Sequence, residues 1–182
     1  MPFNDHLQRT VTSALASVPP IEAADIYAIS FYLWNEDDDP QRPVLTLGYN
    51  TEAQVQQVLD SAHGRRYPDP AEARWNYAYW LQNELAVVGD SIQDPDGATQ
   101  RDEWIKGAST ADEHLWVTAR FVEACTQLAR HLHESGQIKQ AIGQPAPVLV
   151  HELEYYEQIA QQTEVANPPG LAADFLAWVR EQ

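Results

Sequence analysis

The sequence predicts a single α+β domain, in which helices flank a small and mainly antiparallel sheet. Two runs with strand character, 26–34 and 44–49, lie on either side of a polar loop, as in an antiparallel hairpin. Apolar residues at helical spacing occur before the hairpin, over 4–18, and after it, over 110–134. The length of 182 residues fits one domain, and a hydrophobic fraction of 44% supports a packed core without disulfides.

The first half of the chain predicts a helix followed by the hairpin. A helix is expected over about 4–18, because its apolar pattern ends at a Pro-Pro pair. The run Ile26–Trp34 is rich in β-branched and aromatic residues, and both of its faces carry large side chains. We therefore expect a strand that is central in its sheet or covered on both sides. The hairpin spans about 26–49, and its tip has four consecutive carboxylates, Glu36–Asp39.

The elements after the hairpin are expected to be short. Thr51 and Gln54 match a capping box at the start of a helix. The aromatic run 74–80 fits a helix or a turn better than a strand, and 85–88 fits a short strand or helix. The polar segment 89–108 is expected to be a loop that contains an Asp-Pro-Asp-Gly turn.

The clearest helix is expected over about 110–134. Thr110 and Glu113 match a capping box at its start, and Gly136 suits its end. Cys125 lies on the apolar stripe of this helix, where a thiol behaves as a small hydrophobic group. The remaining expected elements are a strand over 146–151 and helices over 152–163 and 171–179.

The composition is strongly acidic. The chain has 11 Lys and Arg residues and 27 Asp and Glu residues, for a formal net charge of −16. Because phosphate backbones and anionic membranes attract Lys and Arg, this balance argues against nucleic-acid and membrane partners. The expected partner is a basic protein; the alternative is that the negative charge only maintains solubility. The chain start has no signal-peptide pattern, so the cytoplasm is the expected location.

Motifs of catalysis or metal binding are not recognisable, so we expect no catalytic residue, metal or cofactor. A single cysteine excludes a disulfide framework and a multi-Cys zinc site. His131 and His133 are two residues apart on one expected helix and point away from each other. The acidic run at the hairpin tip lacks the spacing of a calcium loop. The alternative is a noncontiguous carboxylate/histidine site that uses His151, Glu152 and Glu154.

The aromatic run has two interpretations, which the sequence leaves open. Trp75, Tyr79 and Trp80 fit core packing, because Trp and Tyr side chains have the largest apolar areas. They also fit a contact with another protein, because Trp and Tyr are enriched in binding hot spots.

Several of these motifs together resemble a bacterial family of small α+β proteins of unknown function. The motifs are Tyr27-Ala28-x-x-Phe31-Tyr32, Tyr49-Asn50-Thr51-Glu52, Arg74-Trp75 with Tyr79-Trp80, and the late pair Asn167-Pro168. The resemblance covers about 20–80 and the Asn-Pro pair, and the segment 89–108 lies outside it. Relatives of that family are often immunity proteins of polymorphic toxin systems. The resemblance therefore implies a protein that neutralises a toxin, and it implies no catalytic residues.

The charge and the resemblance agree on one expected function, a non-enzymatic acidic protein that binds a basic toxin domain. Toxins that attack nucleic acid are commonly basic, and an acidic inhibitor associates with them quickly through electrostatic steering. Two alternatives stay open: a small hydrolase or metal-dependent enzyme with the carboxylate/histidine site, and a protein of purely structural or oligomeric role. The expected binding residues are the steering charges Glu36, Asp37, Asp38 and Asp39 and the anchors Trp34, Trp75 and Tyr79.

Overall fold

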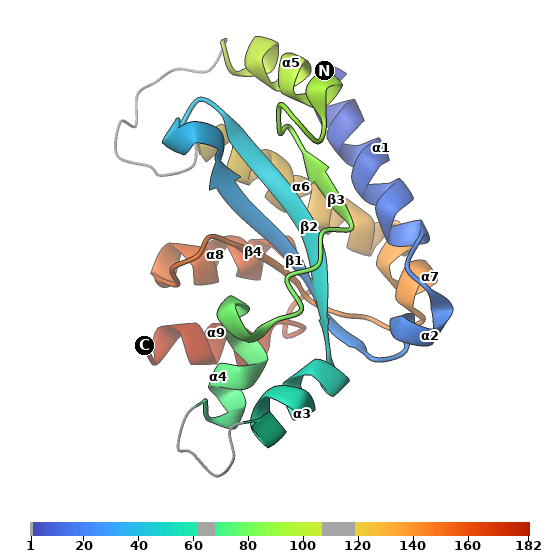
Figure 1. Ribbon diagram of the computed structural model, residues 1–182, viewed down its shortest axis with the longest axis vertical. Helices are drawn as coiled ribbons and strands as arrows, with labels where there is room; N and C mark the ends of the chain where they lie inside the picture. Colours follow the sequence, from blue (N-terminus) through green and yellow to red (C-terminus); the bar gives the residue numbers. More distant parts are fainter. Residues whose placement is uncertain (1, 62–67, 107–118) are drawn as a thin grey trace.

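A four-stranded sheet forms the centre of the part of the chain that the computed structural model describes, residues 2–61, 68–106 and 119–182 (Figure 1). The strand order is β3-β2-β1-β4. Two of the pairs, β1 with β2 and β2 with β3, are antiparallel, and β4 is parallel to β1. The strands are β1 (Ile26–Asn35), β2 (Pro43–Thr51), β3 (Ala86–Val88) and β4 (Val148–His151). The predicted α+β class with a mainly antiparallel sheet is confirmed.

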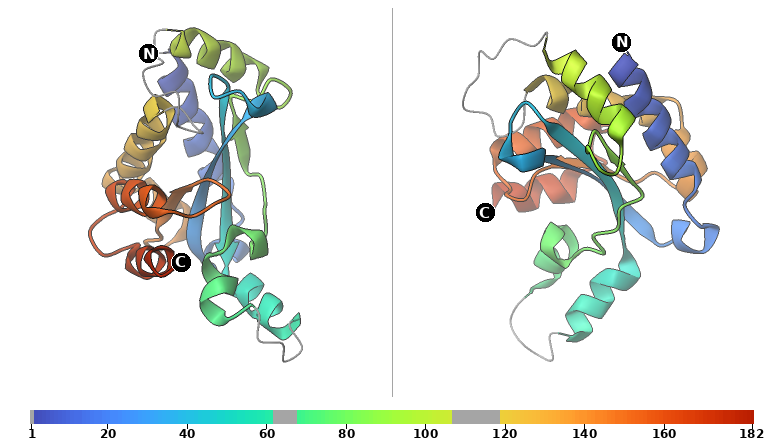
Figure 2. Two further views of the ribbon diagram at one scale, coloured as in Figure 1. Left: turned by 90° about the vertical axis from the view of Figure 1, so that its left-hand side faces the viewer. Right: turned by 45° about the horizontal axis from the view of Figure 1, so that its top comes forward.

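One face of the sheet holds the larger hydrophobic core. Ile29, Phe31 and Leu33 of β1 point to this face and are at most 1% exposed. The helices that pack on it are α1 (Pro2–Ala16), α6 (Ala119–Glu134) and α7 (Gln137–Ile142). Figure 2 shows α1 and α6 running along the strands. Cys125 of α6 is fully buried in this core, as predicted, and burial raises the pKa of its thiol.

The opposite face of the sheet is covered along part of its length. Near the start of β1, Ala28 is buried in a second core together with Leu149 of β4. Further along β1, Tyr32 and Trp34 point to the same face and are only half-buried. The elements that cover this face are α4 (Pro70–Trp75), η2 (Tyr77–Tyr79), α8 (Glu157–Ala166) and α9 (Ala173–Arg180). The prediction of a strand that is central or covered on both sides is confirmed, since β1 lies between β2 and β4 and its first half is covered on both faces.

Side chains of the α8 region close the outer edge of β4. The Asn167 amide accepts from the Val148 amide at 2.8 Å and donates to the Val148 carbonyl at 2.7 Å. Gln162 Nε2 donates to the Val150 carbonyl at 2.8 Å, and Thr163 Oγ1 accepts from the Val150 amide at 3.1 Å. An edge strand otherwise presents unpaired backbone groups. The Asn167 side chain thus satisfies the backbone groups of Val148 that a neighbouring strand would otherwise pair with.

The hairpin that the sequence predicts is present, with a tight tip. Asn35 pairs with Pro43, and the short helix η1 (Glu36–Asp38) makes the turn. Asp37 and Asp38 have φ angles of 55° and 57°. This left-handed region disfavours most side chains, but Asp and Asn tolerate it. The two aspartates therefore suit the left-handed backbone that this turn requires.

The prediction of a loop over 89–108 was wrong. The segment 89–108 contains the helix α5 (Pro95–Ile105) where a loop was expected. Asp94 caps this helix by accepting from the Gly97 amide at 3.2 Å, so the expected Asp-Pro-Asp-Gly turn is its first turn. The helix has a buried stripe in which Arg101 takes a position that is usually apolar. Because a charged residue occupies this core-facing position, the apolar pattern of the helix was not recognisable in the sequence.

Other boundaries are close to the predictions. Thr51 Oγ1 accepts from the Gln54 amide at 3.2 Å at the start of α3 (Glu52–Ser61), as the capping box predicts. The expected Thr110–Glu113 box lies outside the described residues. The helix α8 starts at Glu157 rather than 152, because Tyr156 still has an extended backbone. The short helices α2 (Pro20–Ala23) and α7 had no counterpart in the predictions.

Candidate functional site

Acidic residues gather where the hairpin tip meets α5. We call residues 36–42 and 90–106 the acidic end; they contain nine Asp and Glu residues and three Lys and Arg residues. The two segments lie together at one end of the molecule (Figure 1). The described helices include none that has both the length and the apolar character required to cross a bilayer.

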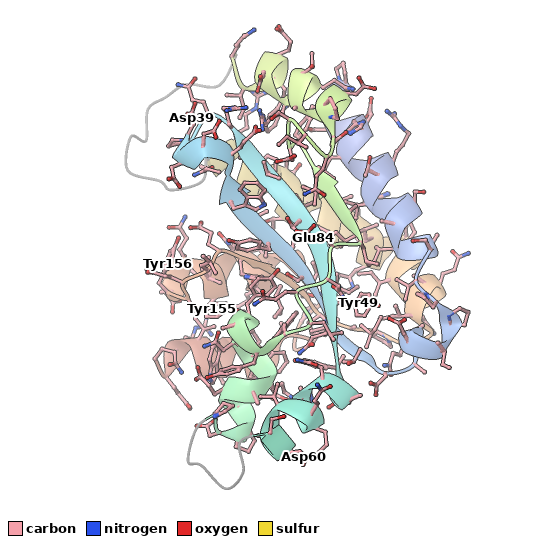
Figure 3. The ribbon with its side chains drawn as sticks, viewed as in Figure 1. Asp39, Tyr49, Asp60, Glu84, Tyr155 and Tyr156 are labelled. Carbon is pink, nitrogen blue, oxygen red and sulfur yellow. The ribbon has the colours of Figure 1, made fainter. Side chains whose placement is uncertain are left out.

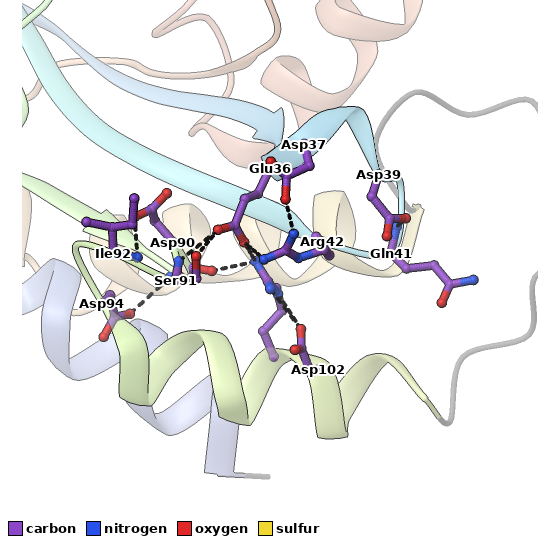
Figure 4. A network of polar contacts seen from close by, with 12 residues as sticks. Glu36, Asp37, Asp39, Gln41, Arg42, Asp90, Ser91, Ile92, Asp94 and Asp102 are labelled. Atoms are coloured by element: carbon purple, nitrogen blue, oxygen red, sulfur yellow. Dashed lines mark hydrogen bonds and ion pairs between the residues drawn. The ribbon is translucent and has the colours of Figure 1, made fainter.

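A fully buried arginine joins the two segments of the acidic end. Arg101 of α5 donates to Glu36 Oε2 at 3.2 Å and to the carbonyl of Gly89. Its Nε and Nη2 both donate to Asp102 Oδ1, at 2.9 and 2.8 Å (Figure 4). A buried cation is tolerated only when carboxylates and carbonyls replace its water. Arg101 therefore fixes the hairpin tip against α5.

Glu36 is the internal carboxylate of this network rather than a surface charge. It is 7% exposed, and it accepts from the Ser91 amide at 3.2 Å, from the Ser91 hydroxyl and from Arg42 Nη2 at 2.8 Å. Burial alone would raise its pKa, but the hydrogen bonds from Ser91 and Arg101 and the charge of Arg42 outweigh burial and lower the pKa. Glu36 is ionised at neutral pH and has its partners inside the protein.

Two further carboxylates shape the turn between β3 and α5. Asp90 Oδ1 accepts from the amides of Ile92 and Gln93, at 2.9 and 2.7 Å. Asp94 accepts from the Gly89 amide at 3.0 Å, and its Oδ2 lies 2.8 Å from His6 Nε2. Asp90 and Asp94 therefore stabilise the backbone of this turn by accepting hydrogen bonds from its amides. The exposed charge comes from other residues of the acidic end, which are Asp37, Asp38, Asp96, Asp102 and Glu103.

The structure separates the sequence-predicted binding residues into two groups. Trp34 lies next to the tip residues Asp37–Asp39, and its indole donates to Thr46 Oγ1 at 3.0 Å. Trp75 is 7% exposed, and its ring lies 5.5 Å from that of Tyr27 near the other end of β1. That separation is roughly 20 Å along the strand. Tyr79 is the last residue of η2, four positions after Trp75, and is half-buried. Glu36 and Trp75 face the interior, so little of either side chain reaches the surface.

His151 occupies the centre of an aromatic group on the second face of the sheet. The ring centroids of Tyr77, Tyr32, Tyr155 and Trp80 lie 4.9, 5.7, 5.8 and 6.4 Å from that of His151. We call these five residues the His151 cluster. The His151 cluster joins β1, η2, β4 and the segment before α8, and it therefore fixes the position of the Tyr32 side chain relative to these elements.

The His151 imidazole is neutral and fully hydrogen-bonded. Burial lowers its pKa to about 4, against a weaker effect of its hydrogen bond with the Glu152 backbone. Nδ1 lies 2.9 Å from the Glu152 carbonyl and donates to it, so Nε2 accepts from Ser30 Oγ at 2.8 Å. Ser30 and His151 are at most 1% exposed. The pair resembles a nucleophile and its base only in distance, since neither side chain is exposed to a substrate.

The structure also places the residues of the alternative carboxylate/histidine site. His151 is buried, Glu152 is half-buried and Glu154 is exposed, so the three side chains do not share one environment. The described ranges contain no group of three His, Cys, Asp or Glu residues placed to hold a metal ion.

Sequence reasoning missed Arg101, Ser91, Tyr32 and Tyr77 as residues that organise these regions. Arg101 falls three residues after Ala98 and four before Ile105, both buried, and this spacing is the signal that marks it as a core-facing residue. Ser91 gave no signal, because its partner Glu36 is 55 residues away. Comparisons with known proteins add no relative: no protein-family model, curated protein or solved structure matches the chain.

Proposed function

We propose that the protein is a non-enzymatic inhibitor that binds a basic protein through its acidic end, as an immunity protein binds a toxin domain, and that it acts in the cytoplasm. The observation that supports this role best is the Arg101–Glu36 network. It uses the buried carboxylate of Glu36 to fix the hairpin tip against α5. Other carboxylates of the tip stay at the surface, such as Asp37, which pairs with Arg42 and still has 77% of its side chain exposed.

Exposed charges of one sign on a well-ordered surface suit an inhibitor that binds a basic protein. Exposed charges on one face steer an oppositely charged protein and raise the association rate, an effect that salt weakens. Because internal bonds already hold the tip, its ordering adds little cost on binding. Trp34 lies beside the tip and supplies an apolar anchor. Tyr79, at the far end of β1, belongs to the contact only if the partner spans the sheet face.

The test is to titrate the protein with the basic products of neighbouring genes and to measure the association rate at several salt concentrations. The double variant Asp37→Asn/Asp38→Asn removes two charges, and Asn tolerates the same left-handed backbone. We expect its association to slow about fivefold at low salt and to depend less on salt.

The matched control is Asp60→Asn/Asp174→Asn, which removes two exposed charges away from the acidic end (Figure 3 labels Asp60 and Asp39). Its association rate is expected to stay within about twofold of the unmodified protein. The proposal fails if no basic partner binds, or if tight binding is insensitive to salt and to the Asp37→Asn/Asp38→Asn change.

A further inference from the structure

Three loops lie at the same end of the sheet because three of its strands run in one direction. β4 is parallel to β1, and β3 has the direction of β1 because both are antiparallel to β2. The loops that follow these strands are the hairpin tip 36–42, the turn 89–94 before α5 and the segment 152–156 before α8. We call these three segments together the three-loop surface.

The strand register gives the relative positions of the three loops. Val88 at the end of β3 lies level with Leu33 of β1, because both pair with the same residue of β2. His151 at the end of β4 pairs with Tyr32. The two outer loops therefore begin at nearly the same level, and β1 continues to Asn35, roughly 7–10 Å further. In the strand order, the hairpin lies between β3 and β4, so its tip extends beyond a loop on each side.

Each of the two outer loops exposes a large apolar side chain. Ile92, in the turn before α5, is 86% exposed, and Leu153, in the segment after β4, is 68% exposed. The described ranges contain six exposed large hydrophobic side chains, and Tyr156 is the third of them on the three-loop surface. Single exposed hydrophobic residues are common, but their concentration in one region is typical of a contact site.

Ordered backbone presents both of these apolar side chains. The Ile92 amide donates to Asp90 Oδ1 at 2.9 Å (Figure 4). The loop after β4 is fixed near both ends, because His151 Nδ1 donates to its first carbonyl at 2.9 Å and the Tyr77 amide donates to Tyr155 Oη at 3.0 Å. Little further ordering is needed when such loops contact another protein, so contacts with them favour binding.

We infer that Ile92 and Leu153 are further apolar anchors for the basic partner, one on each side of the acidic tip. This inference rests on the proposed function and deepens it by giving the shape and chemistry of the surface that is recognised. Charge complementarity selects the partner, because the exposed carboxylates Asp37, Asp38 and Glu154 lie on the same three-loop surface.

The partner that fits is a basic protein with a groove for the hairpin tip. Lys and Arg side chains on the floor of the groove would face the tip, and apolar side chains on its two walls would cover Ile92 and Leu153. A second copy of this chain fits less well, because it would bring a second net charge of −16 to the same surface.

Binding kinetics with the basic product of a neighbouring gene test the two anchors. Steering charges act mainly on the association rate, whereas the loss of a buried apolar contact acts mainly on the dissociation rate. Ile92→Ser and Leu153→Ser are each expected to raise the dissociation rate about tenfold. Both variants are expected to keep the association rate of the unmodified protein and its dependence on salt, because they change no charge.

Ile21→Ser is the matched control, because it also replaces an exposed large apolar side chain. Ile21 is 88% exposed on α2, which precedes β1 and lies at the opposite end of the sheet from the tip (Figure 1). Its dissociation rate is expected to stay within about twofold of that of the unmodified protein. If either Ile92→Ser or Leu153→Ser dissociates no faster than this control, the two-sided contact is overturned.

The outcomes separate this inference from the proposed function. If Asp37→Asn/Asp38→Asn slows association while Ile92→Ser and Leu153→Ser dissociate like the control, the function stands and the two anchors fall. If no basic protein binds, both proposals fall. Sedimentation of the free protein tests the other occupant: self-association that Ile92→Ser or Leu153→Ser abolishes would identify a second copy on this surface and would overturn the inference.

Discussion

At the scale of single residues, Arg101 stabilises the acidic end because it is the cation that allows Glu36 to be buried. The partners are 65 positions apart in the sequence, so neither residue alone indicates the pair. Carboxylates in the acidic run therefore divide into two kinds. Glu36 serves the fold, while Asp37 and Asp38 stay exposed.

Removing the Arg101 guanidinium tests this division. Arg101→Met keeps much of the side-chain volume but leaves Glu36 and Asp102 without their buried partner. We expect a loss of about 3 kcal/mol in the free energy of unfolding, because a buried carboxylate without its cation is strongly destabilising. The measurement is urea denaturation near neutral pH. Arg130→Met is the control, since Arg130 is exposed and 3.7 Å from Glu134, and should cost less than about 0.5 kcal/mol. Equal losses would show that the network contributes little.

His151 makes a second prediction, for the dependence of stability on pH. Its pKa is about 4 in the folded protein and 6.5 ordinarily, because burial disfavours the imidazolium. As pH falls from 6.5 to 4, the unfolded chain binds a proton that the folded protein does not. Stability is therefore lost as pH falls, by up to about 3 kcal/mol from this residue.

The comparison of His151→Gln with the unmodified protein isolates this effect. The lowered pKa of Glu36 adds its own loss of stability at acidic pH, and the raised pKa of Glu152 acts in the opposite direction, but both remain in the variant. We expect the variant to be less stable near neutral pH and to lose less stability between pH 6.5 and 4, followed by chemical denaturation. His131→Gln, at an exposed position, should keep the original slope. Identical slopes for all three proteins would show that His151 is not held neutral.

At the scale of elements, local patterns were predictable and distant pairings were not. The hairpin of β1 and β2 follows from two apolar runs and the polar tip between them, all within about 26–49. The parallel pairing of β4 with β1 joins residues more than a hundred positions apart, and no local signal specifies it. Helix α5 was missed because its core-facing position holds Arg101, whose burial depends on Glu36. For the site, the sequence indicated the acidic tip and Trp34, but not which carboxylate is buried.

The β4 edge provides a prediction at this scale. Asn167→Ala removes both hydrogen bonds to the Val148 backbone and leaves two buried polar groups unpaired. We expect a loss of about 2–4 kcal/mol in unfolding free energy. Amide hydrogen exchange at Val148 is expected to accelerate. Gln161→Ala is the control on the adjoining helix α8, because Gln161 is exposed and bonds only to Glu157 at 3.3 Å within the described segments. A loss no larger than that of the control would mean that the edge does not need this side chain.

At the scale of the whole molecule, function and stability make opposite demands on the charge. Under the proposed function, a net charge of −16 serves to steer a basic partner from a distance, but it also makes the folded chain repel itself. The acidic end concentrates this repulsion, since 36–42 and 90–106 hold six more carboxylates than cations. The internal bonds to Arg42 and Arg101 offset part of it.

This balance predicts that salt stabilises the free protein and weakens its complex. Raising NaCl from about 0.02 M to about 0.5 M shortens the screening length several-fold and should raise the unfolding free energy by about 1 kcal/mol near neutral pH. The same change should slow association with a basic partner. The control is the same titration near pH 4.5, the isoelectric point of the sequence, where the net repulsion vanishes and stability should hardly respond to NaCl. A protein that salt stabilises equally at both pH values would owe the effect to something other than its charge. Steering by the acidic end would then lose its physical basis.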